Sequence, residues 1–157
     1  MKFQAKLLLV FFVVAGLITG CSKDKYNAEK QAGIDDGLIV DFIKKNNISA
    51  TKHSSGLYYQ IITPGTGDFK INASSTVTVN YEGKLLDGSV FDKSKQAITF
   101  SLSQVIKGWT IGIPLIQPGG RIRLLIPSTL AYGNESPGPG IPKNSVLDFT
   151  VDLISVK

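Results

Sequence analysis

Cysteine and histidine are nearly absent from this sequence of 157 residues, since each occurs only once. A single cysteine excludes an internal disulfide framework and a cysteine-rich zinc site, and a single histidine excludes a cluster of imidazole ligands. Net charge is also small: 17 basic residues against 12 acidic ones give +5, and no long basic run with interleaved aromatic residues occurs. We therefore expect no metal site, no cofactor and no nucleic-acid partner.

The sequence also lacks an apolar run long enough for a permanent transmembrane helix. Residues 7–18 are apolar and follow Lys2 and Lys6. At about 1.5 Å per residue, a helix of this length falls well short of a hydrocarbon core of about 30 Å. A short apolar run behind basic residues is typical of a signal peptide for export.

The lone cysteine stands at the end of this segment, in the sequence Leu-Ile-Thr-Gly-Cys, which resembles the lipobox of bacterial lipoproteins. The resemblance implies that residues 1–21 are a lipoprotein signal peptide and that Cys21 becomes the first mature residue and carries lipid. Two or more acyl chains anchor a protein stably, so we expect lipid anchoring in the cell envelope, facing the periplasm or at the outer membrane. Ser22, in place of an aspartate, favours the outer membrane by the same resemblance. A cleaved secretory signal with an incidental free cysteine is the alternative.

Residues 22–56 are expected to form a polar tether and a short helix. The tether is predicted over 22–30, which is polar with charges of both signs. Apolar residues then recur at helical spacing from Ile34 and end before two asparagines at 46–47, which predicts a helix. Asp35 and Asp36 would lie in its first turn, where the helix dipole favours acidic groups, and we interpret them as structural. The spacing leaves open whether this helix packs on its own domain or pairs with a second copy.

Residues 57–157 have the sequence pattern of an α+β domain. Short β segments separated by turn residues predict an antiparallel sheet, and one helix is expected to pack on one face of it. The predicted strands span residues 57–62, 76–83, 89–92, 98–102, 121–126 and 147–153, and the predicted helix spans 105–115.

An ordered set of motifs in this segment carries a family resemblance. The motifs are VNYEG at 79–83, LDGSVFDKS at 86–94, VIKGW at 105–109, LAYG at 130–133, IP at 141–142 and LDFTVDL at 147–153. In this order and spacing they resemble the FKBP-type peptidyl-prolyl cis-trans isomerase family over residues 57–157. The resemblance implies an FKBP-like antiparallel sheet of five strands wrapped around one short helix, with an apolar pocket between them.

The resemblance also assigns residues to that pocket. Its catalytic residues would be Asp92, Trp109, Tyr132, Phe91, Tyr81 and Ile106, and its substrate-binding residues would be Val105, Ile141 and Phe149. Trp109 would be the floor under the proline ring. The Ile106 N–H and the Tyr132 hydroxyl would each donate to a substrate carbonyl, and Asp92 would orient the substrate rather than act as a general base.

Two features differ from the family pattern. Many members carry a further aromatic residue on the strand before the helix, and we assign that place to Ile98, leaving Phe100 in the core. The loop at 134–140 lacks the usual histidine. The pocket walls are therefore expected to be less similar to the family than the floor is.

The residue types fit the implied reaction. Rotation about an X–Pro bond faces a barrier of about 18–20 kcal/mol, because the C–N bond has partial double-bond character. The twisted transition state has a less polar carbonyl than the planar amide, so a water-poor aromatic pocket favours it without a covalent intermediate. The expected partners are proline-containing segments of exported proteins and macrolide inhibitors. A peptide-binding chaperone with little catalysis is the alternative, and the oligomeric state is left open.

Overall fold

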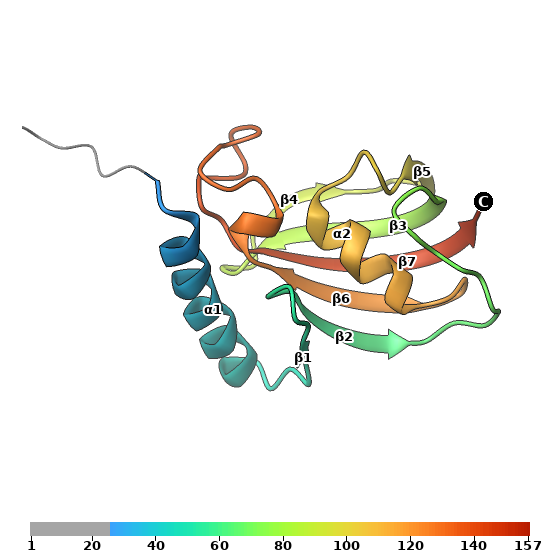
Figure 1. Ribbon diagram of the computed structural model, residues 1–157, viewed down its shortest axis with the longest axis horizontal. Coiled ribbons are helices and arrows are strands. Elements are labelled where there is room, and N and C mark those ends of the chain that lie inside the picture. Colours follow the sequence, from blue (N-terminus) through green and yellow to red (C-terminus); the bar gives the residue numbers. More distant parts are fainter. Residues whose placement is uncertain (1–25) are drawn as a thin grey trace, which may run out of the picture.

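A twisted antiparallel sheet carries a short helix on one face and a longer helix at one end (Figure 1). The structure is a computed structural model, and it describes residues 26–157. The predicted signal peptide at 1–21 and the predicted lipid site at Cys21 lie outside the described residues. The elements are α1 (Ala28–Lys45), β1 (Thr51–Lys52), β2 (Tyr58–Thr63), β3 (Thr76–Leu85), β4 (Val90–Lys93), β5 (Ile98–Ser101), α2 (Lys107–Gly112), η1 (Ile113–Leu115), β6 (Arg121–Ile126), η2 (Ser128–Leu130) and β7 (Leu147–Val156).

Helix α1 begins earlier than its apolar pattern indicates. Asn27 caps it, because its side-chain oxygen accepts a 2.9 Å hydrogen bond from the Lys30 N–H. The prediction of a tether over 22–30 is therefore wrong for its last residues, which belong to α1. The first turn of α1 is polar and exposed, so its composition resembles that of a linker. Asp35 and Asp36 consequently lie in the middle of α1 and not in its first turn.

The antiparallel α+β architecture is confirmed, but the sheet contains seven strands, against six predicted from the pattern and five implied by the resemblance. The strand order is β1-β2-β6-β7-β3-β4, and β5 also pairs with β3. The extra strands have simple origins. β4 and β5 pair with successive parts of β3 and are separated by the turn at 94–97, and β1 is a two-residue addition at the opposite edge.

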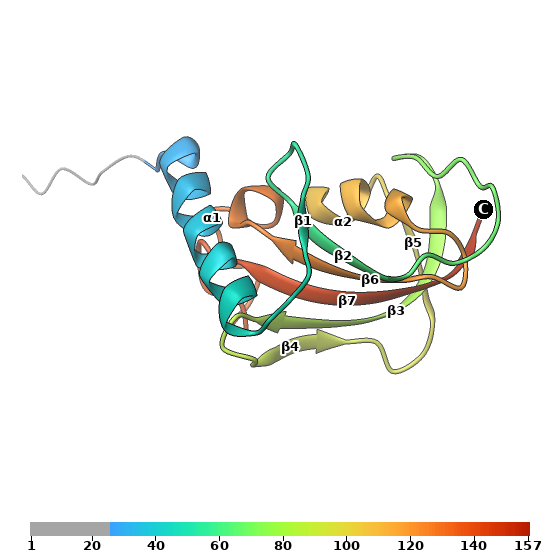
Figure 2. The same ribbon diagram turned by 90° about the horizontal axis from the view of Figure 1, so that it is seen from below.

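Helix α2 packs closely on one face of the sheet, as Figure 2 shows. Two glycines permit the close approach. A Cβ at Gly108 would lie 2.5 Å from Ile126 Cγ2, and one at Gly112 would lie 2.5 Å from Leu124 Cδ2. The core between α2 and the sheet consists of fully or almost fully buried aliphatic side chains, among them Leu57, Val77, Val79, Leu102, Ile113, Ile122, Leu124, Ile126, Leu147, Val151 and Leu153. This core fixes the place of α2, which carries Trp109.

Helix α1 packs on the same domain through a second, smaller cluster. Ile39 is fully buried and lies with Tyr58, Leu125 and Val146. One face of α1 therefore packs on its own domain, which is one of the two arrangements that the spacing of the helix leaves open. Within residues 26–157, no helix is both long enough and apolar enough to cross a bilayer.

Candidate functional site

A cavity of about 460 Å³ lies between α2 and the β3–β4 side of the sheet. Its lining is mainly aromatic and aliphatic, with few polar groups. The lining residues are Tyr81, Asp92, Phe100, Gln104, Val105, Ile106, Trp109, Tyr132 and Phe149. Cavities of this kind, apolar with a few placed polar groups, are the usual sites for small ligands and short peptide segments.

Trp109 is at the base of this cavity, in the first turn of α2. Only 4% of its surface is exposed. The rings of Tyr81, Phe100 and Phe149 meet it edge-on, with centroid distances of 5.2, 5.8 and 5.3 Å. Edge-to-face packing of this kind holds an aromatic ring in one orientation. The indole N–H is buried and has no hydrogen-bond partner among residues 26–157. The floor of the cavity is therefore a rigid and water-poor aromatic surface.

A tyrosine–carboxylate pair forms one side of the cavity. β3 pairs with β4 so that Gly83 lies opposite Asp92, which brings the Tyr81 hydroxyl to Asp92 Oδ2, to which it donates at 2.7 Å. Burial, followed by the hydrogen bond to Asp92, raises the pKa of Tyr81 to about 12. Burial, followed by the charge of Asp92, also raises the pKa of Tyr132. Both tyrosines are therefore neutral donors at physiological pH.

Two donors in the site are free to bind a ligand. Ile106 stands immediately before α2 with φ −59° and ψ 148°, and its carbonyl accepts the Trp109 N–H at 2.9 Å. The N–H of Ile106 and the hydroxyl of Tyr132 donate to no group within the part of the chain that the structure describes. Tyr132 is 38% exposed. An N–H at the α2 end and a hydroxyl on the loop after η2 thus offer hydrogen bonds to one occupant of the cavity.

A second hollow of about 360 Å³ adjoins the cavity and shares Asp92, Tyr132 and Phe149 with it. Phe91, Ile141 and the loop at 137–140 complete it. The structure thus places the nine predicted pocket residues around two connected hollows. Tyr81, Val105, Ile106 and Trp109 line the first, Phe91 and Ile141 line the second, and the three shared residues line both.

Two residues of the cavity are missing from the sequence prediction. Phe100 was expected in the core, but it lines the cavity beside Trp109. Phe100 therefore takes the aromatic position on the strand before α2 that the sequence prediction assigned to Ile98. Ile98 and Phe100 are two residues apart and so lie on the same face of β5. The alternation identifies this face as apolar, but it does not show whether a residue on it lies in the core or lines the pocket. Gln104 gives no signal in the sequence, because a polar residue in a loop is ordinary.

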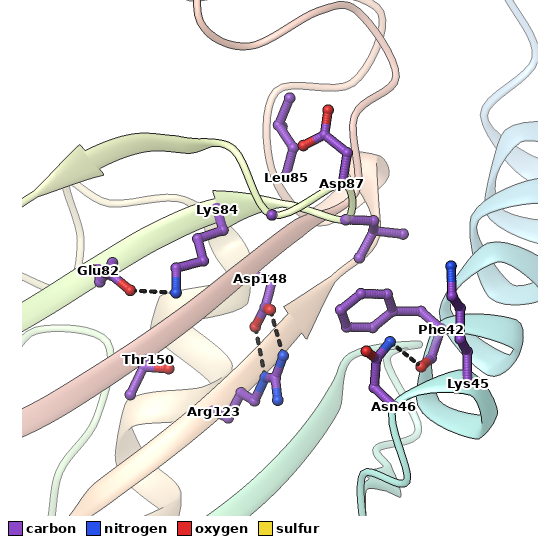
Figure 3. Close-up of a pocket in the computed structure, with 12 residues that line it drawn as sticks. Phe42, Lys45, Asn46, Glu82, Lys84, Leu85, Asp87, Arg123, Asp148 and Thr150 are labelled. Carbon is purple, nitrogen blue, oxygen red and sulfur yellow. Dashed lines mark hydrogen bonds and ion pairs between the residues drawn. The ribbon is translucent and has the colours of Figure 1, made fainter.

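A hollow of similar size, about 470 Å³, lies on the other face of the sheet beside the end of α1 (Figure 3). Its charged groups are largely paired with each other. The Arg123 guanidinium donates two hydrogen bonds to the Asp148 carboxylate, at 2.8 and 2.6 Å, and lies 5.7 Å from the Phe42 ring centre. Phe42 is the one aromatic residue in its lining. This hollow lacks the stacked aromatic floor, so we take the cavity above Trp109 as the candidate site.

Comparison with known proteins gives consistent results. The family model for FKBP-type peptidyl-prolyl cis-trans isomerase matches residues 67–154, a range that contains all nine predicted pocket residues. A probable FKBP-type peptidyl-prolyl cis-trans isomerase of Haemophilus influenzae is 39% identical over 148 residues, which are 92% of this chain and 60% of that protein. The outer membrane protein MIP of Legionella longbeachae is 48% identical over 106 residues, or 66% of this chain and 45% of that protein.

Solved structures share the fold. The crystal structure of FkpA from Escherichia coli has a TM-score of 0.70 at 41% identity, covering 83% of this chain and 62% of that one. A peptidyl-prolyl cis-trans isomerase from Pseudomonas syringae pv. tomato has a TM-score of 0.72 at 34% identity, covering 85% of this chain and 98% of that one. The fold is therefore FKBP-like. The chain spans about 60% of the length of the Haemophilus relative and about 45% of the length of the Legionella relative.

Proposed function

The chain belongs to the FKBP-type peptidyl-prolyl cis-trans isomerase family, and on that premise we propose that it accelerates rotation about X–Pro bonds in the cavity above Trp109. The observation that carries the proposal is the packing of three aromatic rings edge-on against the Trp109 indole. This packing gives the floor a fixed shape that water solvates poorly. An apolar floor beside two free hydrogen-bond donors suits a proline ring and its flanking carbonyls.

The catalytic effect would come from preferential binding of the twisted amide. A planar amide has strong carbonyl polarity, which water stabilises, whereas the twisted amide has lost resonance and is less polar. Transfer into a water-poor cavity therefore disfavours the planar form relative to the twisted one. Each 1.4 kcal/mol of this difference raises the rate about tenfold. No proton moves and no bond to the protein forms, so no nucleophile is required.

We assign the cavity residues the following roles. Trp109 supports the proline ring, while the Ile106 N–H and the Tyr132 hydroxyl hold carbonyls on either side of the rotating bond. Asp92, fixed by the Tyr81 hydroxyl at 2.7 Å, orients the substrate and supplies negative charge at the rim. The apolar side chains of Phe91, Val105, Ile141 and Phe149 form the walls that bind the flanking residues.

The proposed substrates are proline-containing segments of exported proteins as they fold, and macrolides that fill this cavity would inhibit. We further propose that residues 1–21 are a lipoprotein signal and that lipid on Cys21 holds the protein at a membrane of the cell envelope. The name of the Legionella relative, an outer membrane protein, supports this location. Mass spectrometry of the mature N-terminus tests it, since a free or unprocessed Cys21 contradicts lipid anchoring.

A chaperone that binds peptides without catalysis is the second candidate. The observation in its favour is the hollow beside the cavity, which extends the apolar surface along the loop at 137–140 and gives room for more than one residue of a client. Suppression of aggregation separates the two functions when the client has no rate-limiting proline. An isomerase alone leaves such a client unprotected.

A protease-coupled assay on a proline tetrapeptide, with the purified full chain, tests the main proposal. We expect Trp109→Ala to lower kcat/KM more than tenfold and Asp92→Ala to lower it severalfold, because the first removes the floor and the second the rim charge. Lys45→Ala, on the far side of the sheet, is the matched control. Circular dichroism checks that each variant is folded. Unchanged rates in both cavity variants would contradict the proposed function.

A further inference from the structure

Asp35 carries a carboxyl group in the interior of the protein, and its principal partner lies close to the candidate site. The residue is fully buried. Its Oδ2 accepts hydrogen bonds from the Ser128 N–H at 2.7 Å and from the Ser128 hydroxyl at 2.6 Å, and its Oδ1 accepts one from the Gln31 amide at 2.8 Å. Within residues 26–157, no basic side chain forms an ion pair with it. A buried carboxyl group is tolerated only where hydrogen bonds satisfy it. The bond from Gln31 lies within α1, so the two bonds from Ser128 are the ones that tie the carboxyl group to η2.

Ser128 links this carboxyl group to the backbone around Tyr132. Ser128 is the first residue of η2, the turn that follows β6, and this turn lies beside α1 (Figure 1). Its carbonyl accepts the N–H of Ala131 at 2.9 Å and the N–H of Gly133 at 2.8 Å. These two residues flank Tyr132 in the sequence. Asp35 therefore holds Ser128, and Ser128 holds the chain on both sides of Tyr132.

The other polar contacts of α1 lead elsewhere. The neighbouring carboxylate, Asp36, accepts a hydrogen bond from the Tyr58 hydroxyl at 2.9 Å and pairs with the Lys52 ammonium at 2.5 Å. Those two partners belong to β2 and β1, at the edge of the sheet away from the cavity. Among the described side chains of α1, Asp35 is the one that hydrogen-bonds to η2. Two adjacent carboxyl groups thus hold the same helix to different parts of the domain.

We propose that Asp35 is a positioning residue for the isomerase cavity, which acts by capping η2 and so fixing Tyr132 and the loop that follows it. This inference rests on the proposed function, because Tyr132 is one of its assigned donors. An apolar pair in place of Asp35 and Ser128 would hold α1 on the domain about as well, since replacing both partners of a buried hydrogen bond by apolar groups is often neutral or stabilising. What hydrogen bonds add is a defined geometry, here at the start of the segment that carries Tyr132. Helix α1 is then part of the frame of the active site.

Two substitutions at Asp35, with one at Asp36, test this inference in the full chain. Asp35→Leu keeps the size of the side chain and removes the acceptor, whereas Asp35→Asn keeps an oxygen that can accept from Ser128. Asp36→Leu is the matched control, because it removes a carboxylate of the same helix whose partners lie away from the cavity. The readouts are kcat/KM on a proline tetrapeptide and the hydrogen-exchange rates of the Ala131 and Gly133 amides, measured by NMR.

We expect Asp35→Leu to lower kcat/KM about tenfold and to speed exchange at Gly133 about tenfold, since the hydrogen-bonded cap of η2 is lost. Asp35→Asn is expected to restore both values to within about threefold of the wild type, because it retains the acceptor. Asp36→Leu is expected to leave both values within about twofold of the wild type, because its contacts are remote from Tyr132. If Asp35→Leu does not fold, Ser128→Ala removes only the hydroxyl donor and is expected to give a smaller change in the same direction.

Two results would overturn the inference. Equal losses of kcat/KM in Asp35→Leu and Asp36→Leu would show that both groups act only by holding α1 on the domain. Unchanged exchange at Gly133 in Asp35→Leu would show that the link to η2 does not fix the loop. A wild-type chain without isomerase activity would refute the proposed function instead, while the comparison of Gly133 exchange would still decide whether Asp35 holds η2.

Discussion

The Tyr81 hydroxyl donates a 2.7 Å hydrogen bond to the Asp92 carboxylate across the β3–β4 ladder. This bond ties an aromatic wall of the cavity to the one carboxylate among its lining residues. It leaves the Asp92 carboxylate in a fixed orientation, although Asp92 is an exposed residue. The hydrogen bond therefore gives a surface carboxylate a defined position in the site.

Removing either partner of this pair should lower activity, and removing both should add little. We expect Tyr81→Phe and Asp92→Asn each to lower kcat/KM about threefold to tenfold, equal to about 0.6–1.4 kcal/mol in the transition state. The double variant should resemble the more affected single variant, because the two groups act as one unit. Isomerase kinetics on a proline tetrapeptide measure all three. Strict additivity of the two losses would show that the hydrogen bond has no part in catalysis.

Activity should not depend on pH between about 7 and 10 through Tyr81. Burial and the Asp92 hydrogen bond raise the pKa of Tyr81 to about 12 from its ordinary value of 10.0, so the hydroxyl stays neutral where a free tyrosine is half ionised. Because the folded-state pKa is raised, the stabilisation from this group is complete below pH 10 and is lost as pH rises toward 12. NMR exchange spectroscopy on a proline peptide measures the rate without a protease. A fall centred near pH 10 that is absent in Tyr81→Phe would contradict this prediction.

Gly83 should tolerate no side chain. A Cβ there would lie 2.6 Å from Phe91 Cζ and 2.7 Å from Phe149 Cε1, so both rings must move. We expect Gly83→Ala to lower the free energy of unfolding by about 1–3 kcal/mol and to lower kcat/KM, because the two rings form pocket walls. Gly37→Ala is the control, since its Cβ meets nothing within 4 Å and α1 should gain about 0.5–1 kcal/mol. Urea unfolding measures the stability of both variants, and isomerase kinetics measure kcat/KM. A Gly83→Ala variant that is stable and fully active would show that the walls of the pocket can shift freely.

The Arg123–Asp148 pair on the far face should contribute to stability and not to catalysis. Asp148 is almost fully buried and Arg123 partly so. Arg123→Met leaves a buried carboxylate without its partner, and we expect a loss of about 2–4 kcal/mol, somewhat below that of a fully buried pair. The double variant Arg123→Met with Asp148→Leu should recover much of this loss. Urea unfolding measures the stability of each variant. A double variant as unstable as Arg123→Met would mean that shape, rather than charge, dominates here.

Much of the fold follows from local pattern. The strand predicted over 121–126 is found as β6 at the same bounds, and the alternation at 147–153 belongs to the longer β7. Alternation works at these places because each strand buries one face against α2. It misses β1, which has only two residues, and although it finds β4 and β5 it does not show that the two share one partner strand.

Most of the residues that line the site were predictable from the sequence, whereas the hydrogen bonds that hold them in place were not. Family motifs bring together Tyr81, Asp92 and Trp109, and the structure places all three around one cavity. The hydrogen bond between Asp35 and Ser128 joins residues that are 93 positions apart in the sequence, and no local sequence pattern predicts such a partner. Adjacent acidic residues in a helix look alike in the sequence, yet one is buried and the other pairs with a lysine at the surface.

Trp109 is the one tryptophan in the sequence, and it forms the floor of the cavity. Indole fluorescence responds to the polarity of its surroundings, so the tryptophan emission of the protein reports on a single location. Any compound that enters the cavity displaces solvent from that indole and changes the signal without a label. The protein thus contains its own optical probe for screening ligands at the proposed site of catalysis.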